Sequence, residues 1–302
     1  MLDVPHGFRH AALFLTGAAA CWGVATVVSK RAVDEIAPLT LLPVQLAVSV
    51  VTLAVVVRVR GLRLGWSPQV RRLGVLGLLN PGVAYTLSLL GLVHITASMS
   101  VLLWTVEPVL ILVLARWLLR DRISRRLVVA MVAAFAGVLL IVVQAGAGGA
   151  TFGVALTLAG VAACAAYTVV CRKLLLAEDS TMTVVLLQQC CALAYAVVLF
   201  AGAQLFGGRP GVMQVSGWAW LSAVTSGVFY YAIAFYLYLS GLRRVPAAVA
   251  GIFINLIPVF GITAGYLLLA ERLTLRQWIG AGVVVGAVGA ATLFRKDDRP
   301  AG

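Results

Sequence analysis

The chain is poor in charge, and above all in acidic residues. Only 11% of its 302 residues are charged, against about 25% in a typical soluble domain. Histidine occurs only as His6, His10 and His94, and no His-Glu-x-x-His motif is present. An enzyme inside a membrane needs a nucleophile with a base, or metal ligands, within its apolar segments. The sequence offers neither, so it disfavours that class, and we expect no cofactor and no metal.

Cysteine is scarce as well. The five cysteines lie within apolar segments, and none forms a Cys-x-x-Cys motif: Cys21, Cys164, Cys171, Cys190 and Cys191. We interpret them as small apolar packing residues without a disulfide framework. Rings of charged residues, which build the selectivity filters of many channels, are not visible either, and this disfavours a channel.

Apolar sequence, in contrast, is abundant. Hydrophobic residues make up 62% of the chain, and they come in runs of about 20, the length of one bilayer crossing by a helix. The runs do not alternate apolar and polar residues as the strands of a membrane barrel do. We therefore predict an all-α integral membrane protein that crosses the lipid bilayer with ten transmembrane helices, at residues 11–29, 38–57, 70–92, 96–118, 126–143, 153–173, 183–203, 217–240, 246–270 and 275–294.

The net charge of +13 follows this topology and does not indicate a nucleic-acid partner. If both termini face the cytoplasm, 18 of the 23 Lys and Arg residues lie on the cytoplasmic side. Membrane proteins concentrate positive residues on that side. We therefore predict a multi-pass protein with both termini in the cytoplasm.

The two halves of the chain resemble each other. Pro108 parallels Pro258 at an offset of 150 residues, and Thr26–Lys30 parallels Thr168–Arg172 at an offset of 142. A repeat of five helices must be inverted in the membrane, because five is odd. Inverted repeats are typical of secondary transporters, which bind their solutes near the midplane between the repeats.

The repeat also gives the predicted organisation of the chain. It comprises an N-terminal cytoplasmic segment, a first five-helix repeat, a periplasmic linker, a second five-helix repeat and a cytoplasmic tail, at residues 1–10, 11–143, 144–152, 153–294 and 295–302.

Glu107 is the one acidic residue in the middle of a predicted span, and Pro108 follows it directly. A carboxylate near the bilayer centre costs about 2.5 kcal/mol or more on insertion scales, and it usually faces a bundle interior or a wet cavity. Pro108 removes a helix hydrogen bond, so we predict a helix break beside a buried charge. Two interpretations of Glu107 stay open. It binds a solute or carries a proton, or it only ties its helix to a neighbour.

Other polar and aromatic residues recur at positions that share a helix face. Trp22 and Trp104 lie deep within spans, whereas the other tryptophans lie near span ends, where an interfacial belt is expected. Asn80 and Asn255 lie near prolines, although bonding between helices is the alternative for both. The candidate substrate-binding residues are Trp22, Thr26, Asn80, Tyr85, Ser88, Ser100, Trp104, Glu107, Tyr231, Tyr238 and Asn255.

Three short segments of the chain resemble the sequence pattern of a known family. Leu103–Pro108 in the first half, and Ile254–Phe260 followed by Leu268–Thr274 in the second, are similar to the EamA-type pattern of the drug/metabolite transporter superfamily. The resemblance covers about residues 11–294. Asp121-Arg122 departs from it, because the family more often has Glu-Arg there. The resemblance implies a central cavity between two five-helix halves, and export of small metabolites, often amino acids, from a bacterial inner membrane.

Within that superfamily, the neighbourhoods of Leu103–Pro108 and Tyr85–Ser88 look most like the aromatic amino-acid exporter branch. We therefore predict export of aromatic or large neutral amino acids, or related amphipathic compounds, by alternating access. The alternatives are a drug exporter and a carrier for sugar- or nucleotide-linked compounds. Phosphate recognition favours Arg or Lys in the pathway, but these residues map near span ends. The substrate, proton coupling and the choice between monomer and homodimer stay open.

Overall fold

The computed structural model describes residues 6–62, 64–119, 129, 133, 136, 149–175, 180–205, 215–245, 250, 253–254, 256–276, 278–280, 282–283 and 286. All regular structure in these residues is helical, as predicted. Most of the predicted spans 126–143 and 275–294, and the candidate Asn255, lie outside the described residues.

Six described helices are long and apolar enough to cross a membrane: Arg9–Val33, Pro38–Val59, Pro68–Leu92, Ala150–Leu174, Thr181–Leu205 and Gly217–Leu242. Two shorter apolar helices, Ala97–Ile111 and Ile257–Leu269, lie within the predicted spans 96–118 and 246–270. The structure thus confirms apolar helices at eight of the ten predicted spans, and six of these helices are long enough to cross a membrane. The first helix begins at His6, before the predicted start of its span, because the helix continues beyond the apolar run.

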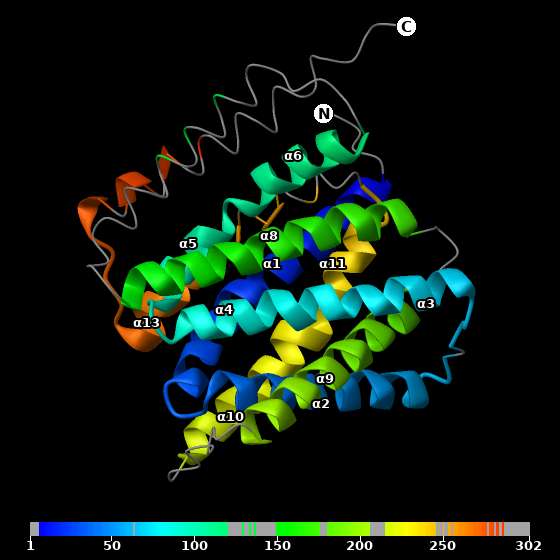
Figure 1. The fold of residues 1–302 in the computed structure, drawn as a ribbon. Helices are drawn as coiled ribbons and strands as arrows, with labels where there is room; N and C mark the ends of the chain where they lie inside the picture. The colour runs from blue at the N-terminus through cyan, green and yellow to red at the C-terminus, as the bar shows by residue number, and fades with distance from the viewer. Residues whose placement is uncertain are drawn as a thin grey trace, which may run out of the picture.

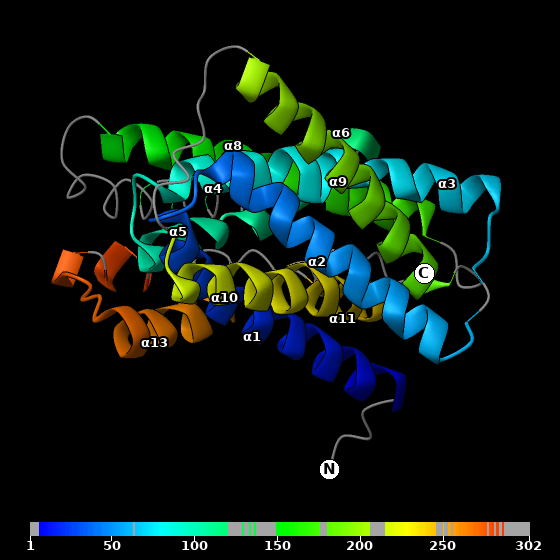
Figure 2. The same ribbon diagram turned by 90° about the horizontal axis from the view of Figure 1, so that it is seen from below.

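The helices pack side by side in one bundle (Figure 1). α1 packs against α13, α11 and α10, while α4 packs against α8 and α2 against α9. In Figure 2, α1 runs beside α13 and the α10–α11 pair, against which it packs. The bounds are α1 (His6–Val33), α2 (Pro38–Val59), α3 (Pro68–Val75), α4 (Ala84–Leu92), α5 (Ala97–Trp104), α6 (Glu107–Leu119), α8 (Gly149–Leu174), α9 (Thr181–Leu205), α10 (Gly217–Ser226), α11 (Ala234–Leu242) and α13 (Ile257–Leu269).

Large apolar side chains cover the outside of this bundle. Those more than half exposed include Leu13, Val51, Val55, Val198, Leu205, Val259 and Leu267. A water-soluble protein rarely exposes so much contiguous apolar surface. In a bilayer the same side chains contact lipid tails, which agrees with the membrane assignment.

Two helices are irregular at matching places in the two halves. Between α3 and α4 the chain forms a 3-10 turn (Leu76–Leu78) and a π-helical turn (Leu79–Val83), and Asn80 leaves helical geometry at φ −146° and ψ 117°. Between α10 and α11 a π-helical segment spans Gly227–Ile233. The two segments end at positions 83 and 233, the same offset of 150 that relates the two prolines. Such widened turns are frequent at functional sites.

The predicted break beside Glu107 is present. α5 ends at Trp104, Thr105 and Val106 form a turn, and α6 begins at Glu107. The amide N–H of Thr105 donates to the carbonyl of Leu102 at 3.1 Å, a tightening of the last turn. Pro108 lies in the first turn of α6, where its missing N–H leaves no helix bond unmade. The break therefore places the carboxylate at a helix start.

Two carboxylates tie the halves together at one end of the bundle. Glu271, just after α13, accepts the amide N–H groups of Ala97 and Ser98 at 2.9 and 2.8 Å and so caps α5. Glu35, just after α1, accepts the amide N–H of Ser216 at 2.7 Å and its hydroxyl at 2.8 Å, where α10 begins. These bonds, the backbone bond first, lower the pKa of the Glu35 carboxyl, because they favour its ionised form. Each half thus supplies one cap to the other.

Replacing Glu271 with Ala is expected to destabilise the protein by about 1.5–3 kcal/mol, the usual range for a hydrogen bond to a charged group. The reason is that the amide N–H groups of Ala97 and Ser98 lose their partner. Thermal unfolding of the purified protein in detergent measures the change. Asp34→Ala is the control, because its ion pair with Lys30 is half-exposed and such pairs contribute about 0–1 kcal/mol. Equal losses in the two variants would contradict the proposed cap.

Candidate functional site

A cavity lies in the middle of the bundle, between helices of both halves. It has about 370 Å³ of space between side chains, of which a part about the size of one water molecule is free for a water centre. The described side chains are therefore packed tightly around this space. The lining residues are Trp22, Thr26, Asn80, Tyr85, Trp104, Glu107, Cys164, Tyr230, Tyr238, Ile254 and Ile257.

Glu107 supplies the one carboxylate among these lining residues, and it is only 3% exposed. The Thr168 hydroxyl, on α8, donates to Glu107 Oε1 at 3.5 Å and lies 3.2 Å from the hydroxyl of Tyr238 on α11. Asn80 Nδ2 donates to Cys164 Sγ at 3.2 Å. A short chain of polar groups therefore links the first-half carboxylate to two helices of the second half.

Aromatic rings form most of the remaining wall. Tyr85 stacks on Trp104 with ring centroids 5.7 Å apart and 25° between the planes, and it meets Tyr230 edge-on at 5.0 Å. Trp22 lies 5.1 Å from Tyr238. Such pairs contribute about 0.5–1.5 kcal/mol beyond their burial. The wall suits an apolar or aromatic group and offers ring faces to a cation.

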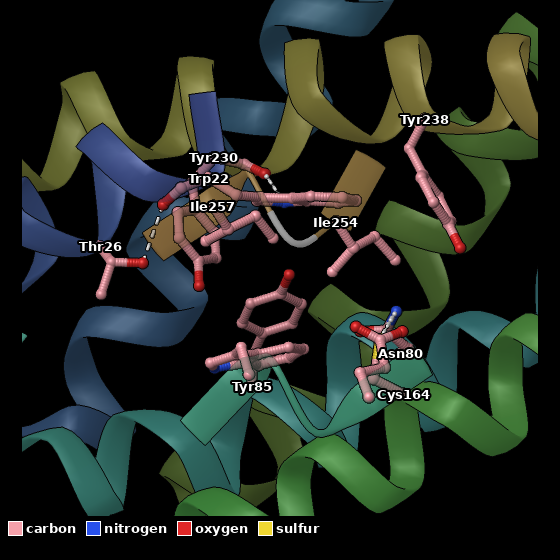
Figure 3. Close-up of a pocket in the computed structure, with 11 residues that line it drawn as sticks. Trp22, Thr26, Asn80, Tyr85, Cys164, Tyr230, Tyr238, Ile254 and Ile257 are labelled. Atoms are coloured by element: carbon pink, nitrogen blue, oxygen red, sulfur yellow. Dashed lines mark hydrogen bonds between the residues drawn. The ribbon is translucent and has the colours of Figure 1, made fainter. Parts of the chain in front are cut away.

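The irregular segment between α10 and α11 positions one of these rings. Trp22 Nε1 donates to the backbone carbonyl of Tyr230 at 3.1 Å, within the π-helical turn. The indole N–H is thereby satisfied by the protein. Figure 3 shows Tyr85 and Ile254 pointing toward the same space from opposite sides. The turn thus fixes the orientation of Trp22 and leaves its ring to face the cavity.

A second, smaller cavity of about 280 Å³ adjoins the first. The two share Thr26, Tyr85, Trp104 and Tyr230, so the aromatic side chains separate them. The second cavity adds hydroxyls and reaches the ends of α1 and α4, being lined also by Ser29, Ser88, Leu89, Leu92, Ser100 and Tyr231. Next to it, Lys30 Nζ donates to the carbonyl of Leu92 at 3.0 Å. This cavity lies between the carboxylate and the end of the bundle that carries the Glu35 and Glu271 caps.

The structure brings ten of the eleven candidate residues to these two cavities. The first cavity is lined by Trp22, Thr26, Asn80, Tyr85, Trp104, Glu107 and Tyr238, and the second adds Ser88, Ser100 and Tyr231. Asn255 lies outside the described residues. Within the described residues, no group of three or more His, Cys, Asp or Glu side chains could hold a metal.

Sequence reasoning missed Tyr230, Cys164, Ile254 and Ile257, which also line the first cavity. The internal repeat could have identified these four residues. These residues are the partners of Asn80, Trp22, Trp104 and Glu107 at the offsets of 150 and 142. Matched positions of the two halves thus face one space, although their side chains differ in chemistry.

Replacing Trp104 with Ala is expected to lower transport by up to about tenfold, because the solute loses contact with one ring face of the cavity, worth about 0.5–1.5 kcal/mol. Initial transport rates in proteoliposomes measure the loss, and thermal unfolding of the same preparation measures stability. Trp220→Ala is the matched control, since that tryptophan is 41% exposed and lines neither cavity. Loss of stability in proportion to the loss of transport would make Trp104 a packing residue only.

Comparisons with known proteins agree with this architecture. The family profile described as "EamA-like transporter family" matches residues 9–143 and again residues 151–293. An uncharacterized transporter of Archaeoglobus fulgidus is 28% identical over 290 residues, covering 91% of this chain and 95% of that protein. The uncharacterized transporter YetK of Bacillus subtilis is 27% identical over 69% of this chain and 63% of its own length. A crystal structure with a TM-score of 0.66 and 21% identity covers 96% of this chain and 99% of its own, and it supports the fold alone.

Proposed function

Because the chain belongs to the EamA-like transporter family, we propose that it exports small amphipathic metabolites that carry an amino group. Aromatic and large neutral amino acids are the first compounds of this class to test. The observation that carries the proposal is the buried carboxylate of Glu107 inside an aromatic cavity. The lining residues come from both stretches that match the family. A solute bound there touches both halves of the protein, as alternating access requires.

The membrane arrangement forms part of the proposal. We place ten helices, as two inverted five-helix repeats at residues 11–143 and 153–294, in a bacterial inner membrane with both termini in the cytoplasm. The distribution of Lys and Arg supports this orientation. The small-molecule substrate and the lipid bilayer are the partners that the proposal requires.

In this orientation the two carboxylate caps lie at the outer end of the bundle. The Glu35 and Glu271 bonds hold that end closed, and the aromatic side chains shared by the two cavities separate Glu107 from it. Release of a solute outward then requires movement of Tyr85, Trp104 and Tyr230, and loosening of the caps. Rocking of one half against the other would supply this movement.

The test is uptake of radiolabelled compounds with an amino group into proteoliposomes without an ion gradient, using an aromatic, an aliphatic and a charged amino acid together with the aromatic amine phenethylamine. The proposal expects equilibration of the aromatic or large neutral compounds above that of protein-free liposomes. A second series with an imposed proton gradient covers coupled transport. If neither series moves any compound with an amino group, the proposed substrate class is wrong. Selective movement of the charged amino acid would contradict the role given to the aromatic wall.

A further inference from the structure

The charges that face the two cavities are unbalanced. Among the described lining residues, Glu107 is the one carboxylate, and no Lys, Arg or His is present. An α-amino acid brings an ammonium group and a carboxylate that lie on the same carbon. The ammonium group finds a partner in Glu107, but the carboxylate finds no cation among the lining residues that the structure describes. Near a buried carboxylate of like charge, a second one is disfavoured.

The hydrogen-bond partners of Glu107 also favour a ligand that donates hydrogen bonds. An ionised carboxylate offers about four acceptor positions and no donor. The described side chains that interact with it are the Thr168 hydroxyl, at the long distance of 3.5 Å, and the Cys164 thiol, a weak donor. The carboxylate therefore keeps acceptor capacity for N–H groups of a ligand.

The walls complete a site for a cation. Trp22, Tyr85, Trp104, Tyr230 and Tyr238 all line the cavity that contains Glu107. Aromatic faces attract cations, and the attraction grows when water is removed. Ile254 and Ile257, the partners of Trp104 and Glu107 in the second half, add apolar surface and no charge. A compact molecule with one apolar ring and one ammonium group matches this lining throughout.

Resting on the proposed function, the geometry points to a narrower substrate class. The cavity selects small aromatic or aliphatic amines with a net positive charge, and it disfavours the α-amino acids that bear the same side chain. Glu107 binds the ammonium group, and the described lining residues offer the carboxylate one like charge and no cation.

Three compounds that share one phenyl ring test this inference: phenethylamine, phenylalanine and 3-phenylpropionate. Near pH 7 they carry a net positive, zero and negative charge. Calorimetric binding to the protein in lipid nanodiscs is expected to rank them in that order. Phenethylamine should bind at least about tenfold more tightly than phenylalanine. This ratio of dissociation constants corresponds to the free energy of one hydrogen bond to a charged group. Phenylalanine that binds as tightly as phenethylamine, or no binding of phenethylamine, would overturn the inference.

Two variants show whether Glu107 makes the selection. Glu107→Gln should weaken phenethylamine binding and bring the ratio between phenethylamine and phenylalanine close to one. Asp34→Asn is the matched control, because that carboxylate is half-exposed and lines neither cavity, and it should keep the wild-type ratio. An unchanged ratio in Glu107→Gln would also overturn the inference.

Failure of this inference differs from failure of the proposed function. If phenylalanine binds as tightly as phenethylamine and crosses the proteoliposome membrane, selection by charge is wrong and export of compounds with an amino group stands. If no compound with an amino group crosses, the proposed function itself fails, whatever the binding ratio.

Discussion

Replacing Glu107 with Gln is expected to lower transport about 10- to 100-fold without loss of folded protein, because a hydrogen bond to a charged group contributes about 1.5–3 kcal/mol. Gln keeps the shape of the side chain and removes its charge. Burial of an amide within the membrane costs less than burial of a carboxylate, so the thermal stability should stay constant or rise. Initial transport rates and thermal unfolding, measured on one preparation, give both quantities.

The opposite pattern would identify Glu107 as a purely structural group. If its main role is to tie α6 to α8 through Thr168, then Glu107→Gln should lower stability and transport together. The pH dependence of transport separates two functional roles. A variant that keeps the wild-type pH dependence shows that Glu107 does not carry the coupling proton.

Replacing Gly77 with Ala is expected to destabilise the protein by about 3 kcal/mol, at the upper end of the usual cost of overpacking. A Cβ at this position would lie 2.6 Å from both the carbonyl carbon and the Cα of Gln188, and closer still to the carbonyl oxygen. These are backbone atoms of α9, so a side-chain rotation cannot relieve the overlap. Thermal unfolding in detergent and the yield of monodisperse protein measure the effect.

To relieve this overlap, α9 would have to move away from position 77, and that movement would break two hydrogen bonds of Gln188. Gln188 Nε2 donates to the carbonyl of Leu73 at 3.0 Å, and the hydroxyl of Tyr167 donates to Gln188 Oε1 at 3.0 Å. Gly202→Ala on the same helix is the matched control, because a Cβ there meets no atom within 4 Å. Ala has a higher helix propensity than Gly, so the control should be neutral or slightly stabilised. Similar stability of the two variants would show that α9 moves freely away from position 77.

The parts of the fold that could be predicted from the sequence are those encoded along the chain itself. Apolar runs of bilayer length predicted the helices, and Pro108 predicted the break between α5 and α6. The π-helical turn at Gly227–Ile233 contains no proline and could not be predicted locally. It depends on packing, since Trp22 bonds to a carbonyl within it from a distant helix.

The cavity was predictable to the extent that its residues are polar or unusually placed. Glu107, Asn80 and Trp104 stand out in apolar sequence. Ile254 and Ile257 do not, because an isoleucine inside a membrane helix is the expected residue whether it faces lipid, core or solute. Only the internal repeat distinguishes them, by aligning each with a conspicuous residue of the first half.

The hydroxyl of Thr168 has one proton, and both Glu107 and the hydroxyl of Tyr238 lie within reach of it. When it donates to Glu107, it has no proton left for Tyr238, so the tyrosine hydroxyl must itself be the donor across their 3.2 Å contact. The polarity of the chain then runs one way, from Tyr238 through Thr168 to the carboxylate. A ligand N–H that takes the place of Thr168 at Glu107 releases the threonine proton, and the direction of the contact with Tyr238 can reverse. Binding of a ligand to Glu107 in the first half would in this way change the orientation of the Tyr238 O–H bond on α11, in the second half.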